Sequence, residues 1–339
     1  MTKRYTLLAI LAVLGCAAAS RADVFPNDQY YAPYQWYGPV IGLPTAWSIS
    51  TGSPGVTVAI LDTGVMASTP DLAGPRLLDP LSATGTEPLD GTDNHHGTWV
   101  ASVAGMGVNN RIGGAGVGNF SILPVTVTDA DGLNSYADIA TGIKMAANAG
   151  ARVINISQAT LKYGPLDDAA AYARSKGALV FVAAGNSGTR KEMPAEYENL
   201  IFVSGTDRDD GLWSGSTYGS FVDLSAPADD ILVADPTFES GYGLGDGTSF
   251  AAPLAAGAAA MVWSINPSLT PDEVQNILYT TADDLGPLGW DEVYGWGRLD
   301  IGAAAERAYE MTLTPEPGTL LLLAAGLAAP LARRLRRRP

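Results

Sequence analysis

The chain has 339 residues, of which 47% are hydrophobic and 16% are charged. This composition excludes a largely disordered chain and allows one large domain with a buried core. The formal net charge of −15 argues against a nucleic-acid partner.

Residues 1–22 are predicted to form a secretory signal peptide. Two basic residues precede the uncharged run 5–20, which is shorter than the roughly 20 residues that a membrane-spanning helix needs. Small residues follow, and we expect cleavage after Ala22, with Ala19 as the alternative. The only cysteine, Cys16, lies inside this segment, so a mature chain would contain no disulfide.

Short apolar runs rich in β-branched residues are predicted to be strands at residues 56–62, 122–128, 151–157, 178–184 and 200–205. Residues 139–150 and 166–177 have helical length and end in glycine, which commonly follows a helix terminus. Another helix is expected after Thr270, where Pro271 suits the first turn and Glu273 can complete a capping box. Alternating strands and helices predict an α/β protein with a parallel sheet.

Four polar residues stand where these elements begin or end. Asp62 ends the first predicted strand, and Asn186 follows the fourth within a glycine-rich loop. Ser249, in GDGTSFAAP, begins an apolar stretch that is typical of a buried helix. Since the two histidines are His95 and His96, and His96 opens HGTWVASVAG, His96 is the candidate imidazole base.

Each of these residues also has an ordinary structural explanation, as a turn, capping or incidental residue. Asp62-Thr63-Gly64 additionally matches the motif of aspartic peptidases. That chemistry needs two carboxylates sharing a proton, and the sequence contains no second Asp-Thr-Gly.

Taken together, in the order Asp62, His96, Asn186 and Ser249, the four residues resemble the subtilisin family over approximately residues 26–308. The resemblance implies a three-layer α/β/α fold with a mainly parallel central sheet and the activity of a serine endopeptidase. It implies that His96 is the general base for Ser249 and that Asp62 orients the imidazole. Asn186 and the backbone N–H of Ser249 would bind the oxyanion.

The same resemblance implies two sets of substrate-binding residues. The strand that pairs with the substrate backbone would contain Ser157, Gln158 and Ala159. The wall of the first specificity pocket would contain Ala183, Ala184 and Gly185. The sequence departs from the family at Ser157-Gln158-Ala159-Thr160, where Ser-Leu-Gly-Gly is usual. Specificity is therefore not transferable from the family. Trp99 replaces the second histidine of His-Gly-Thr-His, a change that we expect to be tolerated.

Three further residues resemble a calcium site of thermitase-type subtilases. Asp28 stands in the N-terminal segment PNDQYY, Asp71 follows the Asp62 motif, and Asn110 lies in the loop VNNRIGGAG. Ligation by oxygen alone suits Ca²⁺ rather than zinc. Solvated loop residues are the alternative interpretation. No organic cofactor is expected.

Maturation is also predicted from the resemblance. Few residues separate Ala22 from the matching region, so we expect no folded inhibitory propeptide and no N-terminal processing beyond signal removal. Met193-Pro194 matches the position of a cis-proline in the family.

The C-terminal segment has three parts. Pro315-Glu316-Pro317 precedes the uncharged run 318–332, and five arginines follow. This arrangement resembles the PEP-CTERM sorting signal, which implies an exosortase-type processing partner and export through the inner membrane of a Gram-negative bacterium. An ordinary C-terminal membrane anchor and a basic tail for nucleic acid are the alternatives. Without the first 22 residues and the segment after Pro317, 12 basic and 35 acidic residues remain, a net charge of −23.

The predicted organisation is a signal peptide at 1–22, a peptidase domain at 23–312 and a sorting tail at 313–339. We expect a monomer that acts on proteins or peptides outside the cell. The alternative function is that of a catalytically silent, surface-displayed binding protein with the same fold.

Overall fold

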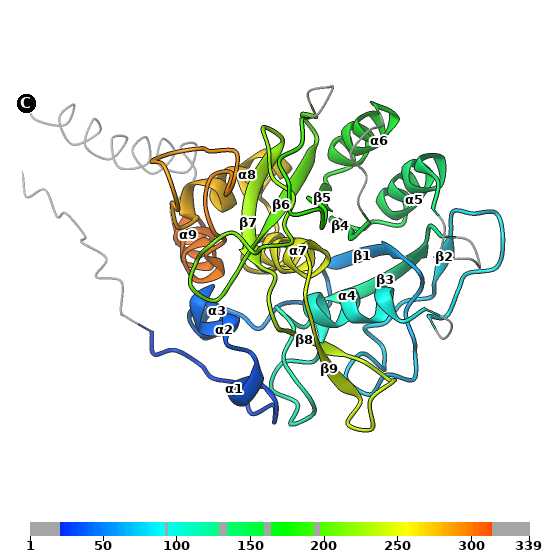
Figure 1. The fold of residues 1–339 in the computed structure, drawn as a ribbon. Coiled ribbons are helices and arrows are strands. Elements are labelled where there is room, and N and C mark those ends of the chain that lie inside the picture. Colours follow the sequence, from blue (N-terminus) through cyan, green and yellow to red (C-terminus); the bar gives the residue numbers. More distant parts are fainter. Residues whose placement is uncertain (1–20, 92–93, 129–133, 159–163, 193–196, 314–339) are drawn as a thin grey trace, which may run out of the picture.

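The computed structural model describes residues 21–91, 94–128, 134–158, 164–192 and 197–313 (Figure 1). A seven-stranded sheet in the order β2-β3-β1-β4-β5-β6-β7 forms the centre, and all its strand pairings in these residues are parallel. Its strands are β1 Thr57–Asp62, β2 Leu81–Ser82, β3 Ser121–Thr126, β4 Val153–Ile156, β5 Leu179–Ala183, β6 Leu200–Thr206 and β7 Val222–Pro227. An antiparallel hairpin contains β8 Ile231–Ala234 and β9 Tyr242–Gly245.

Helices cover both faces of the sheet (Figure 1). They are α1 Tyr31–Tyr34, α2 Tyr37–Val40, α3 Leu43–Ile49, α4 His96–Gly105, α5 Tyr136–Asn148, α6 Gly164–Ser175, α7 Thr248–Ile265, α8 Pro271–Thr281 and α9 Ile301–Leu313. Helices α5 and α6 lie on one face, and α4 and α7 lie on the other.

Strand β1 shows why both faces need cover. Ile60 is 1% exposed and belongs to the core beneath α4 and α7, whereas Leu61 is fully buried in the core beneath α5 and α6. Since successive side chains of a strand point to opposite faces, a continuous apolar run is stable only between two helical layers. The expected three-layer α/β/α architecture is confirmed.

Helix α7 runs through the main core. Its residues from Thr248 to Trp263 are all buried, and it packs against α4, β5 and β6. The helix is long and apolar enough to span a membrane, but 89% of it is buried inside the protein. This burial identifies α7 as the core helix that the apolar stretch after Ser249 predicts.

The elements predicted from sequence are present, with small shifts at their ends. The predicted strand 151–157 is shortened to β4, and the helix predicted at 139–150 begins earlier because Ser135 caps α5 by accepting from Asp138 N–H. The capping box of α8 is confirmed, with Thr270 and Glu273 bonded reciprocally. The predicted cis bond at Met193-Pro194 lies outside the described residues.

Candidate active site

Several of the candidate residues meet in one cleft of about 400 Å³. Its described lining consists of Thr63, Asn94, His96, Trp99, Ser157, Gln158, Asn186 and Ser249. Asp62 ends β1 beside this cleft, and His96 is the first residue of α4. The loops that follow parallel strands all lie at the carboxyl-end edge of the sheet. Parts of the chain that are distant in sequence therefore meet there.

Asp62 and His96 form the polar pair at the base of the site. His96 Nδ1 lies 2.8 Å from Asp62 Oδ1 and 3.0 Å from Oδ2. Asp62 is fully buried and also accepts a hydrogen bond from Thr63 N–H at 2.8 Å. Because a carboxylate only accepts, Nδ1 carries the proton and Nε2 of neutral His96 is left as a base.

The environment of His96 changes its pKa in two directions. Burial of the imidazole lowers the pKa, whereas the charge of Asp62 and the hydrogen bond to it raise the pKa. The net result is a pKa above the ordinary value of 6.5. His96 therefore takes up a proton more readily than a free imidazole does.

Ser249 stands in the first turn of α7 and is 9% exposed. Its Oγ donates to the carbonyl of Ser157 at 3.1 Å, and Ser157 Oγ donates to the carbonyl of Ser249 at 2.7 Å. In the described chain, the acceptor for the Ser249 hydroxyl is thus Ser157 rather than the imidazole. A hydrogen bond between a serine and its histidine base is often long or poorly aligned without substrate, and it tightens only in the substrate complex.

Asn186 is oriented by Thr248. Asn186 Oδ1 accepts from Thr248 N–H at 3.0 Å and from Thr248 Oγ at 2.8 Å, while Thr248 Oγ accepts from Gly185 N–H at 3.0 Å. With its oxygen engaged, the Asn186 amide presents its Nδ2 donors to a ligand. Thr248 was missed by the sequence analysis, although it directly precedes Ser249 in Gly-Thr-Ser.

Thr63 and Asn94 were also missed, and both support His96. Asn94 Oδ1 accepts from His96 N–H at 3.1 Å. Thr63 Oγ donates to Asn94 carbonyl at 2.9 Å and accepts from Gly97 N–H at 3.0 Å. The Asp-Thr-Gly tripeptide was the available signal, because its threonine fixes the start of α4 against β1.

The expected substrate-binding residues are partly located. Ser157 and Gln158 line the cleft, whereas Ala159 lies outside the described residues. Ala183 and Ala184 are buried at the end of β5 and are not among the described lining residues. Gly185 has a positive φ of 105°, a backbone conformation that favours glycine.

Trp99 lies against the imidazole of His96. Its ring meets that of His96 edge-on, with centroids 6.2 Å apart, and it lines the cleft. The residue that replaces the family's second histidine therefore adds apolar surface directly beside His96.

The three candidate calcium ligands lie together, away from the cleft. Asp28 and Asp71 are 4% and 2% exposed, and Asn110 Nδ2 donates to Asp71 Oδ1 at 2.7 Å. Asp28 accepts from the backbone N–H groups of Asn110 and Arg111. Burial raises the pKa of Asp71 to about 6, and repulsion from Asp28 adds to this. In the described part of the chain, no three His, Cys, Asp or Glu side chains form a metal cluster.

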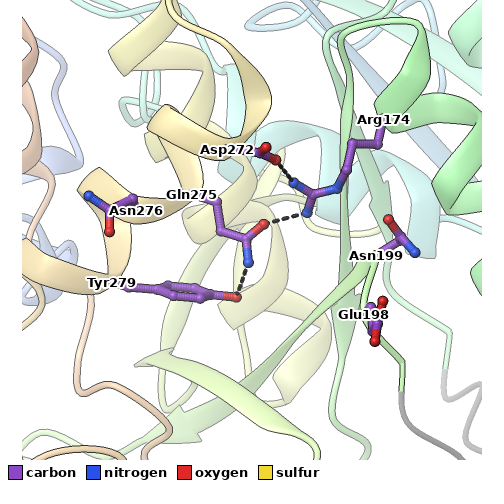
Figure 2. Close-up of a pocket in the computed structure, with 7 residues that line it drawn as sticks. All are labelled: Arg174, Glu198, Asn199, Asp272, Gln275, Asn276 and Tyr279. Carbon is purple, nitrogen blue, oxygen red and sulfur yellow. Dashed lines mark hydrogen bonds and ion pairs between the residues drawn. The ribbon is translucent and has the colours of Figure 1, made fainter.

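A second pocket, of about 390 Å³, lies near the amino end of β6 (Figure 2). Its lining is Arg174, Glu198, Asn199, Asp272, Gln275, Asn276 and Tyr279. Arg174 is paired with Asp272 and Gln275, and Gln275 donates to Tyr279. The described lining includes neither a serine nor a histidine, so the first cleft is the candidate catalytic site.

Comparisons with known proteins agree with this geometry. Residues 53–297 match the subtilase family and residues 313–338 match the PEP-CTERM protein-sorting motif. The chain is 40% identical to thermitase of Thermoactinomyces vulgaris over 268 residues, which cover 78% of this chain and 94% of that protein. It is 38% identical to subtilisin BL of Lederbergia lenta over 257 residues, which cover 75% and 91%.

Solved structures give the same result. A protease of Pseudoalteromonas arctica superposes with a TM-score of 0.74 at 29% identity, covering 84% of this chain and 99% of that one. A lanthipeptide protease has a TM-score of 0.73 at 23% identity with the same coverage and supports the fold alone.

The fold and the relatives define a serine-type endopeptidase. The chain belongs to the subtilase family and carries a PEP-CTERM motif at its C-terminus.

Proposed function

We propose that this subtilase is an exported endopeptidase that hydrolyses peptide bonds with Asp62, His96 and Ser249 as its catalytic triad. The observation that carries the proposal is the 2.8 Å contact between His96 Nδ1 and the buried Asp62 carboxylate, beside a serine at the start of a helix. This contact leaves Nε2 as the basic nitrogen in the cleft that Ser249 lines.

In the acylation step, the hydroxyl of Ser249 turns from the Ser157 carbonyl toward His96 Nε2. His96 removes the hydroxyl proton as Oγ attacks the scissile carbonyl carbon, and the charge of Asp62 stabilises the imidazolium. His96 then gives the proton to the leaving amine, and the C–N bond breaks. An acyl group remains on Ser249 Oγ.

Deacylation repeats the sequence with water. His96 takes a proton from a water molecule, which attacks the acyl carbon, and returns the proton to Ser249 as the ester bond breaks. In both steps negative charge develops on the carbonyl oxygen. Asn186 Nδ2 and the Ser249 backbone N–H, at the positive end of α7, are the donors proposed for that oxygen.

Labelling with a serine-reactive fluorophosphonate tests this proposal. The full-length protein should be labelled and should cleave peptides, and both properties should be lost in Ser249→Ala. Ser220→Ala, which removes an exposed serine, is the matched control and should keep both. An unlabelled wild-type protein that is folded would instead favour the catalytically silent binding protein.

We propose calcium as the structural cation held by Asp28, Asp71 and Asn110. Two buried carboxylates that repel each other, together with an amide, offer the hard oxygen atoms that Ca²⁺ prefers. The side-chain oxygen of Asn110 accepts from Ile112 N–H at 2.7 Å. Ligation by Asn110 therefore requires the amide to turn so that this oxygen faces the carboxylates of Asp28 and Asp71. A bound cation would offset the repulsion and fix the N-terminal segment against the loop 107–113.

The proposed organisation is a signal peptide at 1–22, a peptidase domain at 23–312 and a sorting tail at 313–339. The PEP-CTERM match supports export through the inner membrane of a Gram-negative bacterium and processing of the tail by an exosortase-type enzyme. Intact mass and N-terminal sequencing of the mature protein test this directly. A mature start near Asp23 and a loss of mass at the C-terminal tail are expected, and gel filtration should show a monomer.

A further inference from the structure

An apolar pocket lies on the hairpin that precedes Ser249. It has a volume of about 450 Å³ and is lined by Tyr30, Tyr34, Leu232, Phe238, Ser240, Tyr242, Gly243 and Leu244. We call it the aromatic pocket. None of these side chains carries a charge, and the candidate substrate residues of the cleft are not among them.

Its walls are built from packed rings. Tyr30 meets Tyr34 and Tyr242 edge-on, with centroid distances of 5.7 and 5.2 Å. Phe238 lies over Gly243, where a Cβ would fall 2.8 Å from the Phe238 ring. These contacts pack the rings of the pocket walls against one another and against the hairpin backbone.

Its rim is exposed to solvent. Phe238 is 54% exposed and Leu244 is 47% exposed, whereas Leu232 is 3% exposed and fully part of the protein interior. The Tyr242 hydroxyl donates to Asp71, so its polar atom is already engaged. A hollow with large exposed apolar side chains fits an uncharged, aromatic or aliphatic group.

The hairpin connects this pocket to the catalytic cleft. Ser249 is the fifth residue after Leu244, a span of at most about 17 Å even if fully extended. Ala234 N–H donates to Ser102 Oγ in α4, the helix that begins with His96. Figure 1 shows β8 and β9 beside α4. An extended polypeptide bound at Ser249 can therefore reach the pocket within about five residues.

We propose that the aromatic pocket is an exosite that binds an aromatic or large aliphatic side chain of the polypeptide substrate, about five residues from the scissile bond. The proposal rests on the proposed endopeptidase function. Partial burial of one such side chain is expected to strengthen binding of long substrates about tenfold. The gain should appear mainly in KM, because the contact is equal in the ground state and the transition state.

Kinetics on matched peptides test the exosite. Three long peptides share one cleavable centre: one has phenylalanine five residues before the scissile bond, one has it five residues after, and one has serine at both positions. A short peptide contains the centre alone. We expect a KM about tenfold lower for one of the phenylalanine peptides than for the serine peptide. This preference should be lost in Phe238→Ala and in Leu244→Ala.

Leu288→Ala is the matched control, since it removes a 97% exposed leucine that does not line the pocket and should keep the preference. Cleavage of the short peptide with no preference among the long ones would overturn the exosite and leave the endopeptidase function standing. No cleavage of any peptide by the folded protein would instead overturn the endopeptidase function and the exosite with it. A dimer that dissociates in Phe238→Ala, with unchanged selectivity, would assign the pocket to a second copy of the chain and overturn the proposal.

Discussion

At the residue scale, the contact between His96 and Asp62 determines the pH at which the base is available. The charge of Asp62 raises the pKa of His96 although burial opposes it. A protonated imidazole cannot accept the Ser249 proton. In the proposed mechanism, the loss of activity at low pH therefore follows the protonation of His96.

We expect kcat/KM on a short peptide to fall as the pH drops through a value above 6.5, by about tenfold per pH unit below that value. Asp62→Asn should move this limb to lower pH and reduce kcat by about 10⁴. Circular dichroism at the same pH values checks that the fold persists. Constant activity between pH 8 and pH 4 would contradict the role of His96.

Asn186 has a different proposed role, the stabilisation of negative charge that develops on the substrate carbonyl oxygen. Asn186→Ala should lower kcat by about 100- to 1,000-fold with little change in KM, because the donor acts on the oxyanion rather than on the bound substrate. Steady-state kinetics measures both constants. Asn276→Ala removes a surface asparagine of the second pocket and should leave them unchanged. A defect confined to KM would show that Asn186 binds substrate instead.

Much of the site is predictable at this scale, because few residue types perform its chemistry. Two adjacent histidines and a single Asp-Thr-Gly leave little choice for the base and its partner. Thr248 and Asn94 were not predictable, since threonine and asparagine are common in turns. Their roles depend on distances between loops that only the folded chain defines.

At the element scale, a partly buried acid joins helix α8 to the sheet. Asp223 in β7 accepts from Phe202 N–H of β6 at 2.8 Å and from the hydroxyl of Tyr279 in α8. Tyr279 in turn receives a hydrogen bond from Gln275 (Figure 2). Burial raises the pKa of Asp223 to about 7.

An aspartic acid with a raised pKa stabilises the fold when protonated, and this contribution is lost as the pH rises from about 4 to about 7. Relative to Asp223→Asn, the free energy of unfolding of the parent should therefore fall by on the order of 1 kcal/mol per pH unit over that range. Urea unfolding in a Ser249→Ala background, which prevents autolysis, measures the difference. Relative to Asp168→Asn, which removes an exposed acid on α6 and keeps Asp223, the parent should show no such fall. If the free energy of unfolding of the parent and of Asp223→Asn changed equally with pH, the proposed effect of Asp223 would be wrong.

Prediction of the elements succeeded where apolar periodicity or caps were strong. The capping box of α8 and the buried strands β1, β3 and β5 are examples. The hairpin β8–β9 was missed, because its second strand, YGLG, is partly exposed and lacks an apolar run. The hairpin packs against α4, which lies far away in the sequence.

At the scale of the whole molecule, cohesion comes from two apolar cores and, as proposed, from a cation that holds the N-terminal segment. The melting temperature of Ser249→Ala protein should fall by several degrees when calcium is chelated, because a ligand bound only to the folded state stabilises it. Asp28→Asn and Asp71→Asn should abolish this dependence. Asp209→Asn, an exposed acid, should retain it. An identical melt with and without chelator would reject the calcium site.

The architecture of the whole molecule could be predicted from the alternation of apolar strands and helices, because few chain topologies bury a parallel sheet on both faces. The position of the aromatic pocket relative to the cleft could not be predicted. It depends on how the hairpin sits beside α1 and α4, and no local pattern encodes that arrangement.

The position of Ser249 on α7 has a consequence for biosynthesis. The proposed nucleophile lies in a helix whose first sixteen residues are buried and which packs against the central strands. A nascent or unfolded chain thus contains Asp62, His96 and Ser249 but does not hold them close together. Proteolytic power would be acquired only when folding is complete, which would protect the exporting cell during synthesis and translocation.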